Sequence, residues 1–112
     1  MFIGEKESLN KITEALRRLF PDRLAMVIAF GSRVRGDFDG KSDFDLLVVI
    51  NDLTLEDEIA VMKVISGEEE ITGIPFAPVI KSLASFEKEK SFKTGFYRNI
   101  KKEGMKFYDA YR

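Results

Sequence analysis

The segment Phe44–Ile50 constrains the fold more than any other part of the chain. It is almost continuously apolar and rich in β-branched residues, which is typical of a strand in the centre of a sheet with both faces covered. A second short apolar run, Leu24–Phe30, ends at a glycine and also indicates a buried strand. The core of the protein is therefore expected to form around a sheet.

Helical spacing appears on both sides of these strands. Apolar residues recur every three or four positions over Leu9–Phe20, and the predicted helix stops near Pro21. Thr54 is a plausible N-cap for another helix, which we expect to end at Gly67. The predicted buried stripe of that helix is Leu55, Ile59, Met62 and Ile65.

The C-terminal half adds shorter elements. Ile74–Ile80 predicts a third strand, at a sheet edge or bulged, because Pro75 and Pro78 cannot donate to a ladder. Short helices are expected over Ser85–Lys90 and over Phe96–Glu103, the latter ended by Gly104, with Met105–Tyr108 as a terminal strand or extended segment. The predicted fold class is α+β (mixed α/β), with a small mixed sheet of three or four strands flanked by helices.

The amino-acid composition excludes several kinds of active site. The 112 residues predict one domain spanning residues 1–112, and they include no cysteine and no histidine. This excludes disulfides, thiolate nucleophiles, Ser-His-Asp triads and the usual zinc sites. Carboxylates, lysines, arginines and hydroxyls remain, and oxygen ligands favour a hard cation such as Mg²⁺.

Location and charge are less specific. We find no signal peptide and no apolar segment of membrane-spanning length, so we expect a cytoplasmic protein without a membrane partner. Residues 1–80 carry a net charge of −6 and residues 81–112 carry +5. The basic C-terminal part is either a solvated helical surface, which we favour, or a surface for phosphates or an acidic partner. The sequence shows no platform of aromatic and basic residues on which nucleic-acid bases could stack, so we do not expect a nucleic-acid partner.

Two carboxylates stand at the start of the central strand. Asp43 and Asp45 are two positions apart, so both side chains are expected to leave the same face of the sheet. Carboxylates that converge in this way repel unless a cation or a proton lies between them, and a divalent ion with substrate phosphates would satisfy both. Taken alone, Asp-x-Asp is common, and a loop end on a solvated face is then the favoured interpretation.

A glycine and a serine follow the first predicted strand. Gly31 would allow a ligand to approach the backbone closely, and Ser32 could cap a helical turn that presents N–H groups to phosphates. Three basic residues lie between the two halves of this region and could neutralise a triphosphate: Arg33, Arg35 and Lys41. The alternative, a role in loop solubility, applies to at least one of them.

Together the two halves resemble the signature of the DNA polymerase β-like nucleotidyltransferase superfamily. Phe30-Gly31-Ser32, a ten-residue spacer and Asp43-Phe44-Asp45-Leu46 match its pattern, and the ending at Leu46 looks like that of the minimal nucleotidyltransferases. Segments 96–104 and 107–108 are similar to the last helix and tail of those proteins. The resemblance implies the polymerase β-like fold, two Mg²⁺ ions on Asp43 and Asp45, and a nucleoside triphosphate held by Gly31 and Ser32. An acceptor hydroxyl would then attack the α-phosphorus and release pyrophosphate.

One feature departs from the family pattern. Active members carry a third carboxylate on the next strand, and Ile74–Ile80 contains no acidic residue. Nearby glutamates precede and follow this segment, and we favour their interpretation as exposed charges in helix ends and loops: Glu68, Glu69, Glu70, Glu87 and Glu89.

Two hypotheses follow. In the first, the chain is a metal-dependent enzyme that transfers AMP from ATP to a hydroxyl on a protein or small molecule. The resemblance implies that it would act as the antitoxin of a HEPN-type partner. Alternatively, it is a catalytically weak or inactive nucleotide-binding or partner-binding module on the same fold. Polymerase activity on DNA or tRNA is not expected, because one domain of 112 residues leaves no module that binds a template or an acceptor.

Overall fold

The strands form one mixed sheet in the order β3-β2-β1-β4. A computed structural model describes residues 3–35 and 43–111 of the chain. β1 (Leu24–Phe30) is antiparallel to both β2 (Phe44–Ile50) and β4 (Met105–Asp109), whereas β3 (Phe76–Ser82) is parallel to β2. The predicted fold class, α+β with a small mixed sheet, is confirmed.

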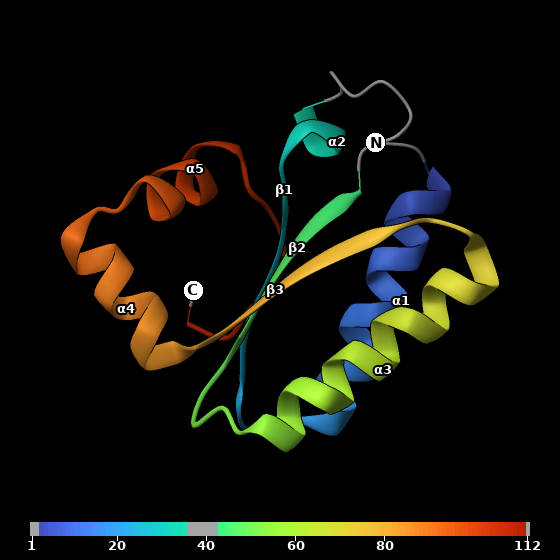
Figure 1. The fold of residues 1–112 in the computed structure, drawn as a ribbon, viewed down its shortest axis with the longest axis horizontal. Coiled ribbons are helices and arrows are strands. Elements are labelled where there is room, and N and C mark those ends of the chain that lie inside the picture. The colour runs from blue at the N-terminus through green and yellow to red at the C-terminus, as the bar shows by residue number, and fades with distance from the viewer. Residues whose placement is uncertain (1–2, 36–42, 112) are drawn as a thin grey trace.

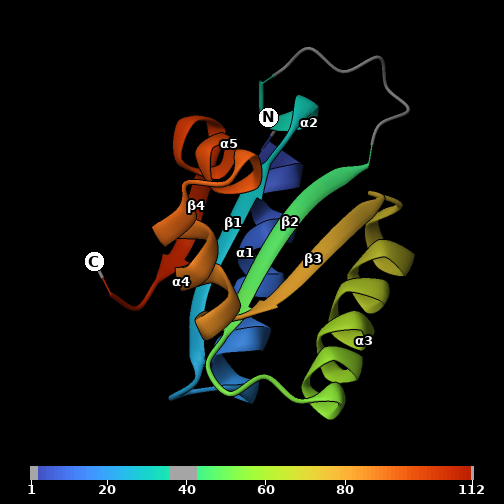
Figure 2. The same ribbon diagram turned by 60° about the vertical axis from the view of Figure 1, so that its left-hand side comes forward.

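Helices cover both faces of this sheet (Figure 1). α1 (Ile3–Leu19) and α3 (Leu55–Thr72) pack on one face, while α4 (Leu83–Phe92) and α5 (Gly95–Glu103) pack on the other. Figure 2 shows α4 and α5 in front of the sheet and α1 behind it. No helix within residues 3–35 and 43–111 is both long and apolar enough to cross a bilayer.

The alternation of side chains along β2 defines the two faces. Phe44, Leu46, Val48 and Ile50 are buried against α1 and α3. Leu47 and Val49 are buried on the opposite face with residues of α4 and α5. Because successive residues of a strand point to opposite faces, Asp45 belongs to the face of Leu47 and Val49.

Most predicted elements are present with small shifts at their ends. The bounds of β1 and β2 are those predicted, and the Met105 segment is a paired strand. α1 begins earlier than predicted, at Ile3, and β3 lies two residues further along than Ile74–Ile80. The prediction that this proline-containing strand lies at a sheet edge is confirmed.

Two predictions about α3 are wrong. The helix does not end at Gly67 but continues to Thr72, where Gly73 adopts a left-handed φ of 74° and caps it. A glycine inside a helix costs only about 1 kcal/mol, and a contact directly after Gly67 offsets this cost: the buried Glu68 carboxylate accepts a hydrogen bond of 2.7 Å from the Ser8 hydroxyl.

The buried face of α3 also differs from the predicted stripe. Leu55, Ile59 and Met62 are exposed, at 72%, 49% and 46%. Ile65 is buried as predicted, and the inward face also carries Asp57, Val61 and Glu68. The physical reason is that polar groups at both ends of the helix find partners inside, and these partners fix its rotation about its axis.

Candidate active site

The chain turns sharply at Gly31, where β1 ends and the short helix α2 (Ser32–Arg35) begins. Gly31 has a φ of 88°, a left-handed value that residues with a Cβ rarely adopt. Its Cα also lies against the side chain of Asp45. A Cβ built on Gly31 would overlap with Oδ2 of Asp45 and lie 3.1 Å from its Cγ. Backbone conformation and available space therefore both require glycine at this half-buried position, and they place its backbone beside a carboxylate.

The pairing of β1 with β2 explains this contact. Asp45 is the register partner of Phe30, the last residue of β1. Asp45 is half-buried, whereas Phe44 and Leu46 on either side of it have no exposed surface. These two core residues fix the strand and thereby the direction in which the carboxylate leaves it, as the sequence pattern predicts.

Asp43 lies just before β2 and is exposed. The backbone N–H of Phe44 donates a hydrogen bond of 2.8 Å to the carbonyl of Pro75, which anchors the start of β2 beside the start of β3. The structure therefore places both predicted carboxylates at the same end of the sheet, next to the turn at Gly31.

The residues present fit a divalent cation that also binds a substrate. Carboxylate oxygens are ligands that Mg²⁺ accepts, and this ion keeps several positions for water and phosphate oxygens. In the described part of the chain, no group of three or more acidic side chains could enclose a metal ion. An ion held by Asp43 and Asp45 would have positions left for substrate phosphates and water.

The position facing Asp45 on the next strand is occupied by alanine. In the parallel pairing of β2 with β3, Asp45 is opposite Ala77 and Leu47 is opposite Val79. Register partners point to the same face of a sheet, so Ala77 and Val79 are the side chains that β3 offers to the site. β3, whose sequence contains no acidic residue, therefore has an alanine at the position beside Asp45.

The glutamates near β3 have other contacts. Glu68 binds Ser8, and Oε1 of Glu69 accepts a hydrogen bond of 2.8 Å from the backbone N–H of Phe76. Glu70 and Glu87 are exposed, as expected. The interpretation as exposed charges is wrong for Glu68, which is buried, and for Glu69 and Glu89, which are half-buried.

Glu89 belongs to a network that sequence reasoning missed. Its carboxylate forms an ion pair of 2.7 Å with Lys81 of β3 and accepts a hydrogen bond of 3.0 Å from Thr94. The hydrogen bond from Lys81 holds the pKa of Glu89 below its usual range, and Thr94 adds to this effect. Lys81 lies four residues after Ala77 and thus on the same face of β3, a spacing that the sequence already contains.

The same network extends to the end of β1. The Lys81 ammonium lies 5.0 Å from the ring centroid of Phe96, and that ring packs edge-to-face on Phe30 at 5.7 Å. Phe30 directly precedes Gly31. The start of α5, the end of β1 and β3 are therefore connected on the face that carries Asp45.

Arg33 faces the other side of the sheet. Its Nη2 atom lies 2.7 Å from Oε2 of Glu5, and both side chains are buried. Its guanidinium also lies 5.0 Å from the ring centroid of Phe44, which points away from the Asp45 face. Arg33 therefore holds α2 against α1 and the core, and its predicted role in binding a triphosphate stays a prediction.

The other predicted phosphate ligands are described only in part. Ser32 and Arg35 form the two ends of α2, and their side chains are not described. Lys41 lies outside the described residues. Their predicted contacts with a triphosphate also stay predictions.

Comparison with known proteins identifies the family. Residues 9–106 match the family model described as "Nucleotidyltransferase domain". This match spans most of the chain, and the chain belongs to the nucleotidyltransferase domain family. The predicted relationship to polymerase β-like nucleotidyltransferases is thereby confirmed.

Relatives and solved structures agree with this assignment. The chain is 28% identical over 100 residues to "Putative protein adenylyltransferase MJ0141" of Methanocaldococcus jannaschii, covering 88% of this chain and 94% of the relative. A crystal structure described as "a putative nucleotidyltransferase from Sulfolobus solfataricus" is 27% identical with a TM-score of 0.56, covering 93% of this chain and 79% of that chain. A structure described as "the toxin-antitoxin with AMP-PNP" has a TM-score of 0.60 at 17% identity and shares the fold, covering 91% and 74%.

Proposed function

We propose that this protein transfers AMP from ATP to a hydroxyl group, with the turn at Gly31 and the carboxylate of Asp45 as its centre. The observation that carries the proposal is the contact between the Gly31 backbone and the Asp45 side chain. It joins the two groups that such a reaction needs, namely backbone that phosphate oxygens can approach and an oxygen ligand for Mg²⁺.

Each of the predicted site residues would have its own role in the reaction. Gly31 and Ser32 would bind the triphosphate, with Arg35 and Lys41 near it to neutralise charge, and Asp43 and Asp45 would hold up to two Mg²⁺ ions. The bound metal supplies charge neutralisation for the phosphates and a lower pKa for the attacking hydroxyl. The hydroxyl oxygen forms a bond to the α-phosphorus, the bond to pyrophosphate breaks, and the hydroxyl proton passes to solvent.

We further propose that the acceptor is a protein. The relative from Methanocaldococcus jannaschii is named for protein adenylyltransferase activity, and this name supports a protein hydroxyl over a small molecule. The likeness in fold to a toxin-antitoxin structure supports a protein partner. We propose a HEPN-type toxin as that partner, with this chain as the antitoxin.

A second candidate function is nucleotide or partner binding with weak or no catalysis. The specific observation in its favour is Ala77, which stands opposite Asp45 where a third carboxylate would accept the hydroxyl proton. Binding of a nucleotide with Mg²⁺ does not depend on that proton transfer and would be retained.

Transfer of label from ATP tests the proposal. The protein is incubated with ATP labelled at the α-phosphate, Mg²⁺ and the product of the neighbouring gene, and compared with Asp43→Asn and Asp45→Asn. Label on the partner protein that both substitutions abolish would establish the transferase. Partner binding in all three proteins without any transfer of label would favour the second candidate.

A further inference from the structure

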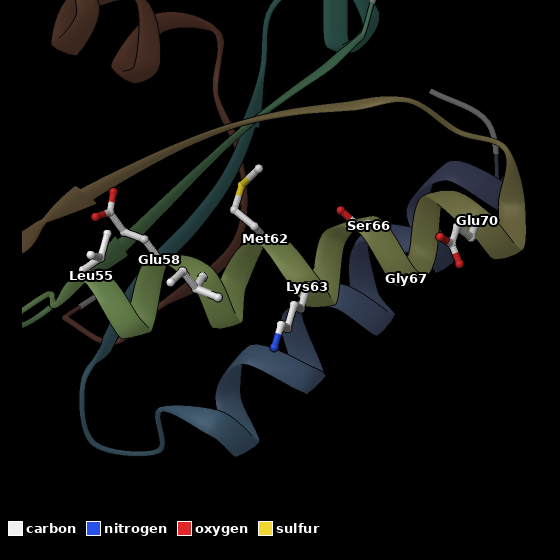
Figure 3. A pocket seen from close by; sticks show the side chains of 8 residues that line it. Leu55, Glu58, Met62, Lys63, Ser66, Gly67 and Glu70 are labelled. Carbon is white, nitrogen blue, oxygen red and sulfur yellow. The ribbon is translucent and has the colours of Figure 1, made fainter.

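The outward face of α3 carries an apolar stripe that nothing in the described chain covers. Leu55, Ile59 and Met62 are between 46% and 72% exposed, and they follow one another at spacings of four and three residues. Ser66 continues the stripe toward the end of the helix. Figure 3 shows Leu55, Met62 and Ser66 along the helix, together with the charged side chains beside them.

This stripe is additional to the face by which α3 joins the core. Val61 and Ile65 are buried toward the sheet, and Asp57 and Glu68 are buried with them. A helix with apolar residues on opposite sides is normally buried on both. The exposed stripe is therefore typical of a surface that contacts another protein.

We propose that a second copy of this chain covers the stripe, with the two α3 helices packed antiparallel about a two-fold axis. The sizes of the side chains match in this arrangement. Leu55 and Ile59 are large and lie in the N-terminal half of the stripe, whereas Ser66 lies in the C-terminal half. With Ile59 against Met62 of the second copy, Leu55 lies over Ser66 of the second copy, and symmetry repeats both contacts.

The charges beside the stripe match as well. Glu56 and Lys63 border the stripe seven residues apart, both are exposed, and neither forms an ion pair within the described residues. The same antiparallel register sets Glu56 beside Lys63 of the second copy, twice. A parallel pair would put Ser66 against Ser66 and leave the opposite charges about 10 Å apart along the axis.

The expected dimer is weak. The 18 residues of α3 span ~27 Å, and contact along a single helix falls at the small end of specific interfaces. Such a dimer forms at high protein concentration and dissociates on dilution. This inference concerns a surface of α3 and does not depend on the proposed function.

Sedimentation over protein concentrations from about 10 µM to 1 mM tests the dimer. Wild type is expected to pass from monomer to dimer, Ile59→Glu to stay monomeric, and Asn10→Glu, which adds the same charge on the exposed face of α1, to behave as wild type. Glu56→Lys and Lys63→Glu should each weaken association by about tenfold, and the double variant should restore it. A monomeric wild type, or a dimer that Ile59→Glu leaves intact, overturns the proposal.

Disulfide trapping tests the orientation of the helices. The chain has no cysteine, so Ile59→Cys and Met62→Cys proteins each carry one thiol. A mixture of the two should form linked dimers under mild oxidation faster than either protein alone. Faster linking of each variant to itself indicates parallel helices and contradicts the proposal. A monomeric chain whose Ile59→Glu variant instead loses a different protein partner assigns the stripe to that partner.

Discussion

Replacing Gly31 with alanine tests whether the turn after β1 packs directly against the carboxylate of Asp45. At a φ of 88° an alanine is strained by about 1–2 kcal/mol. Alanine also reduces the conformational entropy of the unfolded chain relative to glycine, which offsets about 0.4–1 kcal/mol of this strain. The added Cβ also overlaps with Oδ2 of Asp45 and crowds its Cγ and Cβ at 3.1 and 3.3 Å. Displacing a packed group in this way costs about 1–3 kcal/mol.

The expected loss of unfolding free energy is therefore about 1–5 kcal/mol, which is the backbone strain plus the displacement of Asp45, less the offset in the unfolded chain. For a chain of this length, this corresponds to a fall in melting temperature of roughly 4–20 °C. Since the carboxylate must leave its position beside the backbone, stabilisation of the folded protein by Mg²⁺ and ATP should be lost as well.

Gly73→Ala is the matched control. Gly73 has a φ of 74°, and nothing lies within 4 Å of a Cβ built on it, so only the backbone strain remains, about 1 kcal/mol. In an Asp45→Ala background, Gly31→Ala should cost little more than Gly73→Ala does, because the carboxylate is absent and only the contact with Cβ at 3.3 Å remains. Thermal melts with and without Mg²⁺ and ATP measure all of these quantities. Equal costs for Gly31→Ala and Gly73→Ala in the wild-type background would refute the reasoning.

Three further predictions follow from single contacts. Ala77→Asp places a carboxylate opposite Asp45 and should raise label transfer from ATP about tenfold or more; an unchanged rate with intact ATP binding would contradict this. Arg33→Met leaves the buried Glu5 carboxylate without its arginine and should lower the unfolding free energy by about 3–5 kcal/mol in denaturant titrations, with partial recovery in Arg33→Met/Glu5→Gln. Asp57 has a pKa held well below its usual range by its hydrogen-bonded arginine, so its stabilisation is present above about pH 4 and lost as the pH falls. Asp57→Asn should therefore reduce the dependence of the melting temperature on pH in acid. The same dependence as in wild type would exclude this stabilisation by Asp57.

The central strands could be predicted from sequence because their burial is nearly complete. Leu24–Phe30 and Phe44–Ile50 have the predicted bounds, since a strand covered on both faces needs a nearly continuous apolar run. The contact between Gly31 and Asp45 follows from the antiparallel pairing of these two strands. The motif contains both residues, although their contact depends on a register that only the fold supplies.

The rotation of α3 could not be predicted in the same way. Apolar residues lie on two sides of this helix, and local spacing alone does not tell which side is buried. The choice depends on Asp57, whose carboxylate binds Arg23 at 2.7 Å, and on Glu68, which binds Ser8. Both partners lie far away in the sequence. The same is true of the pair between Arg33 and Glu5, which takes this arginine away from the face of Asp45.

The most direct test of the proposed site is Mg²⁺-dependent binding of ATP, measured as the shift in melting temperature. At ATP concentrations about 100 times the dissociation constant, binding stabilises the folded state by about 2.7 kcal/mol, or roughly 10 °C for a chain of this length. Wild type and Asp22→Asn, an exposed aspartate before β1, should show this shift only when Mg²⁺ is present. Asp43→Asn and Asp45→Asn should lose it. A shift that persists in both of these variants would contradict the assignment of the nucleotide and metal site to Gly31 and Asp45.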